Sequence, residues 1–170
     1  MLHRPQRQDE RRGLYTEEER RRRDASPWTI VQGVLAPLQF LVFLVSLWLV
    51  LRFLVTGQGE WAATVSVVVK TLVLYTIMVT GAIWERDVFG QYLFAPAFFW
   101  EDVVSMLVIA LHTAYLWAVV TGALDPRGLA ILALVAYATY VINAAQFLLK
   151  LRAARLEAAS VAPAVAGAAR

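Results

Sequence analysis

The sequence of 170 residues contains no cysteine, which excludes disulfides, thiolate metal sites and a cysteine nucleophile. Charge is also scarce: 17% of the residues are charged and 59% are hydrophobic, whereas about a quarter of a typical soluble domain is charged. Glycine-rich nucleotide-binding motifs and the His-Glu-x-x-His zinc motif are missing as well. The composition therefore favours a membrane protein, and we expect it to need no cofactor.

Four long apolar segments are present, at residues 28–55, 61–84, 101–122 and 128–149. Each is predicted to be a transmembrane helix, because about 20 apolar residues are enough to cross the hydrocarbon core. The predicted fold class is thus an all-α polytopic membrane protein with four transmembrane helices. Residues 1–27 form a basic segment with a short helix, residues 28–149 the transmembrane domain, and residues 150–170 a tail that is expected to be disordered after Glu157.

Lysine and arginine are distributed unevenly around these spans. Eight arginines lie in the first 27 residues, Arg86 lies in the middle loop, and four basic residues follow the last span: Lys150, Arg152, Arg155 and Arg170. The other two loops hold only Arg127, with Arg52 just before the first. Because cytoplasmic loops carry the excess of lysine and arginine, both termini and the middle loop are predicted to be cytoplasmic. Anionic lipid, not nucleic acid, is then the expected partner of the basic residues.

Ionisable side chains inside a span are costly and are functional candidates by default. Lys70 and His112 both fall near the middle of the membrane when depth is counted at 1.5 Å per residue. Their structural alternatives are a snorkelling lysine and a hydrogen-bonded core histidine. Three carboxylates lie in the cytoplasmic third, at Glu85, Glu101 and Asp102. The last two begin a helix, where acidic residues also serve as simple partners of the helix dipole.

Uncharged polar residues accompany these groups on the first, third and fourth predicted spans. We expect five of them to face the bundle as substrate contacts, with helix–helix hydrogen bonding as the alternative: Gln32, Gln39, Ser105, Asn143 and Gln146. The middle loop is rich in aromatic residues, with six between residues 85 and 100. Such a cluster indicates either an interfacial aromatic belt or a lid over a flat ligand.

Five segments contain long and unusual runs of residues. They are LYTEEERRRRDASPW (residues 14–28), VQGVLAPLQF (31–40), FFWEDV (98–103), LHTAY (111–115) and YVINAAQF (140–147). Together these segments resemble the 2-vinyl bacteriochlorophyllide hydratase family, and the resemblance extends over residues 14–157. It assigns no catalytic residue.

The resemblance implies a hydro-lyase of bacteriochlorophyll synthesis in the cytoplasmic or intracytoplasmic (inner) membrane of a phototrophic bacterium. Such enzymes add water to the C3 vinyl group of a chlorin and produce a 1-hydroxyethyl group. The implied substrate is 3-vinyl bacteriochlorophyllide a or chlorophyllide a. A homo-oligomer, or contact with other enzymes of bacteriochlorophyll synthesis, is a further expectation that stays open.

The product suggests the order of steps, because the hydroxyl group is on the carbon next to the ring. A proton would add first to the terminal CH2 group, and water would then attack the resulting cation. Two close carboxylates in a low dielectric cannot both ionise easily, so we expect Glu101 or Asp102 to be the acid and Glu85 the second carboxylate, which holds water.

Alternatives to this mechanism stay open. His112 is a candidate axial ligand for the Mg²⁺ of the substrate, although it lies about 16 Å from Glu101 along the helix. A second version uses His112 as the acid, with Lys70 beside it. A pigment carrier without turnover is a rival function, and a transporter would require an oligomer because four spans show no inverted repeat.

Overall fold

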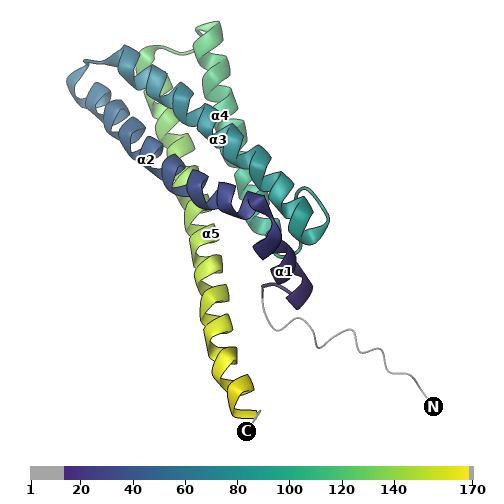
Figure 1. The fold of residues 1–170 in the computed structure, drawn as a ribbon. Helices are drawn as coiled ribbons and strands as arrows, with labels where there is room; N and C mark the ends of the chain where they lie inside the picture. Colours follow the sequence, from purple (N-terminus) through teal and green to yellow (C-terminus); the bar gives the residue numbers. More distant parts are fainter. Residues whose placement is uncertain (1–13, 169–170) are drawn as a thin grey trace.

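The computed structural model describes residues 14–168, with side chains through Leu156. In this part of the chain the regular structure is entirely helical (Figure 1). The five helices are α1 (Glu17–Ala25), α2 (Pro27–Thr56), α3 (Glu60–Phe89), α4 (Phe99–Thr121) and α5 (Pro126–Ala168). Helices α2 to α5 are long and apolar enough to cross a membrane, which confirms the predicted fold class.

Local sequence explains where the helices begin and end. Thr16 and Glu19 form a reciprocal capping box at the start of α1, as the Thr-x-x-Glu pattern predicts. Helices α2, α3 and α4 each end on a glycine in the left-handed conformation, Gly57, Gly90 and Gly122, which has no Cβ to clash there.

The helices α2 and α3 have 30 residues each, about 45 Å at the standard rise. Because this length exceeds a hydrocarbon core of roughly 30 Å, both helices must tilt or extend beyond it. Helix α2 also bends in its N-terminal half (Figure 1). Pro37 lies in that half, where its missing N–H and its ring weaken the helical ladder.

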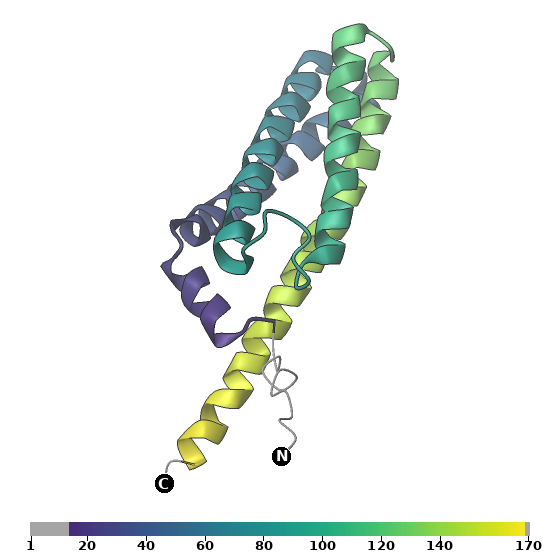
Figure 2. The same cartoon turned by 90° about the vertical axis from the view of Figure 1, so that its right-hand side faces the viewer.

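The bundle consists of two helical hairpins. Helix α2 packs mainly along α3, and α4 along α5, while α2 contacts α5 and α3 contacts both α4 and α5. Figure 2 shows the connection between α3 and α4 lying between α3 and the α4/α5 pair. Helix α1 and the C-terminal half of α5 extend from the same end of the bundle as this connection (Figure 1). Among the described residues, those predicted to be cytoplasmic therefore lie at one end of the bundle.

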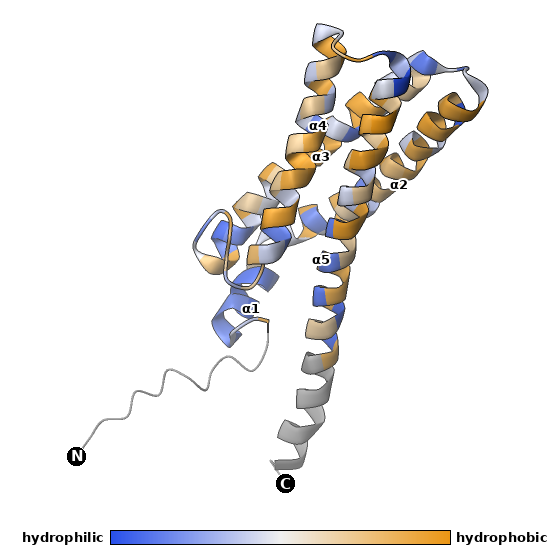
Figure 3. Ribbon diagram, turned by 180° about the vertical axis from the view of Figure 1, so that it is seen from behind, coloured by the Kyte–Doolittle hydropathy of each residue, from blue (hydrophilic) through white to orange (hydrophobic). Residues whose placement is uncertain are grey.

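Hydrophobic residues predominate along the four long helices within the bundle (Figure 3). Large apolar side chains such as Val55, Trp61 and Val120 are at least 80% exposed, which is the pattern of a surface that faces lipid. The interior contains a central apolar cluster that includes Phe43, Val67 and Tyr137. It also contains fully buried polar side chains, which form the candidate site.

Two helices are longer than the apolar segments indicated. Helix α3 continues five residues past Trp84 to Phe89, and α5 continues past Leu149 to Ala168. Hydropathy measures polarity and not helix formation, so it missed helical turns that contain charge. The expectation of a disordered tail after Glu157 was wrong for residues 158–168, because alanine has the highest helix propensity and extends a helix that is already nucleated.

Candidate active site

Two groups of buried polar residues lie at different depths of the bundle. The carboxyl site, at the end where α1 lies, consists of Glu85, Glu101 and Asp102. The central pair, near the middle of the bundle, consists of Lys70 and His112. All five residues are at most 6% exposed, and those of the central pair are completely buried.

In the carboxyl site, Glu85 and Asp102 are in direct contact. Their side chains lie within hydrogen-bonding distance of each other, although they come from different helices, α3 and α4. A hydrogen bond between two carboxyl groups requires one of them to carry a proton. The pair is therefore arranged to share a single proton, as two catalytic carboxyl groups in other enzymes do.

Backbone amides of the α3–α4 connection support this pair. The N–H of Phe94 donates to Asp102 Oδ2 over 2.7 Å, and the N–H of Ala95 donates to Glu85 Oε2 over 3.4 Å. Phe94 has φ of 60°, which is uncommon for a residue other than glycine. This turn of the backbone lies between the two amides that bind the carboxyl groups, so the connection is built around the carboxyl site.

The aromatic residues of the middle loop divide into two groups. Phe98 is buried and packs against Trp84, Phe89 and Phe147 within 6 Å between ring centroids. The others face outward, since Tyr92, Phe94, Phe99 and Trp100 are between 39% and 69% exposed. The inward group forms one wall beside the carboxyl site, and the outward group suits an interfacial belt.

Glu101 has a different partner from the one that the sequence suggested. Lys150 Nζ on α5 lies 2.5 Å from Glu101 Oε2 and also donates to the carbonyl oxygen of Ala97. Glu101 is therefore neutralised by an ion pair instead of sharing a proton with Glu85. Sequence reasoning placed Lys150 in the basic tail and missed this role, since nothing in the sequence pattern links positions 49 residues apart.

Two of the predicted uncharged residues extend this network. Ser105 Oγ donates to Asn143 Oδ1 over 3.1 Å, and Asn143 Nδ2 donates to the carbonyl oxygen of Glu101 over 2.8 Å. These bonds hold α4 and α5 together between the carboxyl site and the centre of the bundle. Their positions fit the packing alternative as well as a contact with substrate.

The glutamines differ in their surroundings. Gln32 donates to Thr80 Oγ1 over 2.7 Å and so joins α2 to α3. Gln39 is 2% exposed, and both polar atoms of its amide have no hydrogen-bond partner within the described part of the chain. Gln146 Oε1 is also without a partner among those residues. Buried polar groups are normally satisfied, so Gln39 marks a place where a water molecule or a ligand belongs.

In the central pair, Lys70 Nζ lies 2.6 Å from His112 Nε2, and His112 Nδ1 lies 2.7 Å from the carbonyl oxygen of Val108. The carbonyl can only accept, so Nδ1 carries the proton and Nε2 accepts from Lys70. Both ring nitrogens are therefore engaged, and His112 has no free nitrogen for a Mg²⁺ ion. Lys70 Nζ also lies 4.1 Å from the ring centroid of Tyr140, a favourable cation–π contact.

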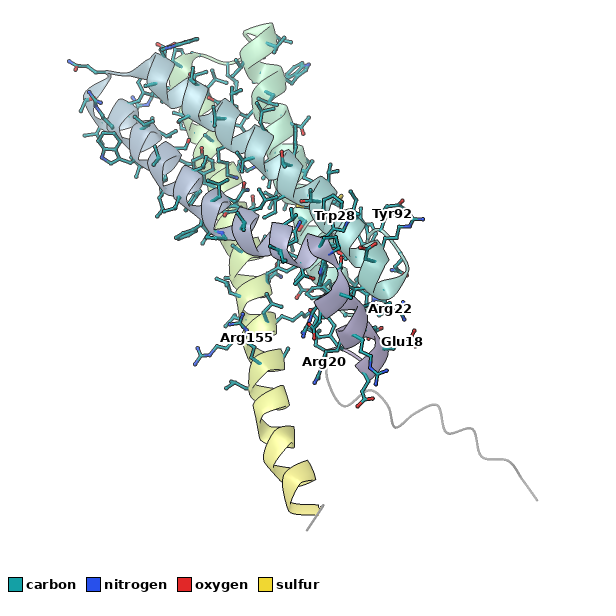
Figure 4. All side chains as sticks on the ribbon, viewed as in Figure 1. Glu18, Arg20, Arg22, Trp28, Tyr92 and Arg155 are labelled. Atoms are coloured by element: carbon teal, nitrogen blue, oxygen red, sulfur yellow. The ribbon has the colours of Figure 1, made fainter. Side chains whose placement is uncertain are left out.

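Helix α1 packs against the end of the bundle that holds the carboxyl site, and Tyr15, just before α1, makes part of this contact. The Tyr15 ring stacks on Phe89 at 5.8 Å and lies under the Arg23 guanidinium at 5.0 Å. Burial raises the pKa of Tyr15 to about 12, although Arg23 acts in the opposite direction. Figure 4 shows Glu18, Arg20 and Arg22 on α1 and Arg155 on α5, all at this end. These basic residues thus lie at the same end of the bundle as the carboxyl site.

A family model described as 2-vinyl bacteriochlorophyllide hydratase matches residues 15–153. The chain belongs to this family. It is 73% identical over 150 residues to a protein of that name from Rhodobacter capsulatus, covering 88% of this chain and 87% of the relative. A second protein of that name, from Cereibacter sphaeroides, is 71% identical over 147 residues, covering 86% and 91%. No solved structure is significantly similar to the chain.

The family match spans all the groups described above. Residues 15–153 include the carboxyl site, Lys150, the central pair and Gln39. Within the described residues, no three His, Asp or Glu side chains converge as metal ligands.

Proposed function

We propose that this protein hydrates the C3 vinyl group of a bacteriochlorophyllide-type pigment, the group numbered 2-vinyl in the family name, and that the Glu85–Asp102 pair performs the chemistry. The observation that carries the assignment is the direct contact between these two buried carboxyl groups. It provides a proton donor and a carboxylate at adjacent positions, which is what acid-catalysed hydration requires.

The hydrogen bonds suggest which group carries the proton. Asp102 accepts the shorter amide bond, 2.7 Å against 3.4 Å for Glu85, and a strong N–H donor favours the ionised form of a carboxyl group. We therefore assign the proton to Glu85 and the negative charge to Asp102. This reverses the roles expected from the sequence, in which Glu85 was the second carboxylate.

Hydration then proceeds in two steps that balance. Glu85 transfers its proton to the terminal CH2 carbon, which becomes a methyl group and leaves a cation on the carbon next to the ring. Asp102 stabilises this cation and accepts a proton from the water whose oxygen attacks it. The hydrogen bond between the two groups returns the proton to Glu85, so the enzyme regenerates without any electron transfer.

The site's location suits an amphiphilic pigment. It lies at the membrane end where the basic residues gather, which we expect to be cytoplasmic, and next to the wall formed by Phe98 and its neighbours. The substrates in view are 3-vinyl bacteriochlorophyllide a and chlorophyllide a, presented from the inner membrane of the bacterium. A second copy of the chain or a neighbouring biosynthetic enzyme would serve to deliver or remove the pigment.

The direct test supplies membranes containing the protein with 3-vinyl chlorophyllide a and follows the pigment by mass spectrometry. A gain of one water, with ¹⁸O incorporated from labelled water, is the expected result. Membranes from cells that lack the protein are the control. Bound pigment that is never hydrated, under conditions where the control behaves normally, would instead identify a pigment carrier.

A further inference from the structure

Lys70 is a buried basic side chain for which the described residues offer no anionic partner. Its side chain is completely buried, its one polar contact is His112, and its other neighbours at close range are the rings of Tyr140 and Tyr137. The three ion pairs within the described residues all lie elsewhere. An ammonium group in a low dielectric without a counter-charge is costly. An anion bound beside Lys70 would offset that cost and stabilise the charged form of the side chain.

An unpartnered amide points to the same region. Gln39 lies one turn from Phe43 on the same face of α2, and Phe43 contacts Tyr137 and Tyr140, the two rings beside Lys70. Gln39 therefore lies about one turn nearer than Phe43 to the end of the bundle that holds the carboxyl site, with both of its polar atoms unsatisfied. A ligand that extends from the carboxyl site to Lys70 would pass this amide.

We propose that Lys70, held by His112, binds the free carboxylate of the pigment's propionate side chain, with the vinyl group at Glu85 and Asp102. This inference rests on the proposed function and names the part of the substrate that the central pair recognises. Asp102 and His112 are ten residues apart on α4, about 15 Å by helical rise. A chlorin ring that stands along α4 with its propionate arm extended bridges this separation.

The arginines of α1 are the rival binding site for the carboxylate. Arg20 and Arg22 are exposed, and at an exposed site a single ion pair contributes little and is screened by salt. Lys70 is shielded from solvent, so an ion pair between the same carboxylate and Lys70 would have a larger electrostatic energy. Whether the proton is already on Lys70 or arrives on the ligand's carboxyl group, the product is the same ion pair.

The test compares two pigments that bind but cannot react, the 3-ethyl analogue as the free acid and as its methyl ester. Full-length protein in nanodiscs is titrated with each, and binding is followed by the pigment's absorption and fluorescence. We expect the wild-type protein to bind the acid about 10- to 100-fold more tightly, the range of a charge-assisted hydrogen bond. Lys70→Met should bind the acid as weakly as the ester, and Lys70→Arg should recover part of the difference.

Val69→Leu is the matched control, because Val69 is the adjacent residue of α3 and is 46% exposed to the lipid side. It should leave the acid-to-ester ratio unchanged. A wild-type protein that binds both pigments equally overturns the proposal even if Lys70→Met does not fold. A Lys70→Met protein that still prefers the acid also overturns it, since that result would place the carboxylate at the α1 arginines. A Lys70→Met protein that loses affinity for both pigments equally overturns it as well. Because the 3-ethyl group cannot be hydrated, these results are independent of the proposed hydratase activity.

Discussion

Replacing each carboxyl group by its amide distinguishes the proposed catalytic roles of Glu85 and Asp102 from the structural role of Glu101. Glu85→Gln removes the proton donor but keeps an N–H that can donate to Asp102, so the local packing should survive. A positioned general acid contributes about 10²–10⁴-fold, and we expect kcat to fall by about that factor, equivalent to roughly 3–5 kcal/mol in the barrier. Asp102→Asn should cause a loss of similar size, because it removes the charge that stabilises the cation.

Glu101→Gln is expected to behave differently, although Glu101 is adjacent to Asp102 in the sequence. Its side chain binds Lys150 over 2.5 Å, and the glutamine carbonyl can still accept that bond. The loss in kcat should therefore stay below about 10-fold, under the range of a general acid. Glu60→Gln, at the exposed start of α3 at the opposite end of the bundle, is the matched control and should be active.

The assay is the rate of 3-vinyl chlorophyllide hydration against substrate concentration in detergent, with helix content checked by circular dichroism. Near-wild-type turnover in both Glu85→Gln and Asp102→Asn would refute the assignment. If His112→Ala were then inactive while still binding pigment, the chemistry would belong to the central pair. Equal losses in Glu101→Gln and Glu85→Gln would instead show that all three carboxyl groups act together.

Two further predictions follow from the sequence and the fold. Reporter fusions should place both termini and Arg86 on the cytoplasmic side, because the lysine and arginine excess lies there; a periplasmic reporter at Arg170 would contradict this topology. Purified protein should hydrate the pigment with water alone, since addition of water is redox-neutral and the sequence carries no nucleotide-binding motif. A requirement for an added nucleotide or a protein-bound metal in that assay would disprove the proposed chemistry.

Features that depend on local sequence could be predicted well. The capping box at Thr16 and Glu19 needs only four consecutive residues. The four spans follow from apolar length, and the depths of Lys70 and His112 follow from counting residues from the span ends. That arithmetic placed the two side chains at similar depth, and the structure brings them to 2.6 Å.

Contacts that depend on how helix ends meet could not be predicted from the sequence. Whether Glu85 meets Glu101 or Asp102 depends on how α4 is rotated about its axis, since adjacent residues point about 100° apart on a helix. The amides of Phe94 and Ala95 reach the pair only because the backbone turns at Phe94. The role of Lys150 required α5 to continue beyond the apolar segment, which hydropathy does not report.

The distribution of charge favours the carboxyl site over the central pair as the place of chemistry. The reaction passes through a cation on the substrate, so the groups beside it should carry net negative charge. In the proposed state Glu85 and Asp102 share one proton and together carry one negative charge, while Lys150 cancels the charge of Glu101. A cation formed beside Lys70 would instead meet a second positive charge in a low dielectric, where repulsion is strongest. Lys70 therefore belongs at a distance from the reacting carbon, and its partner His112 lies about 15 Å along α4 from Asp102.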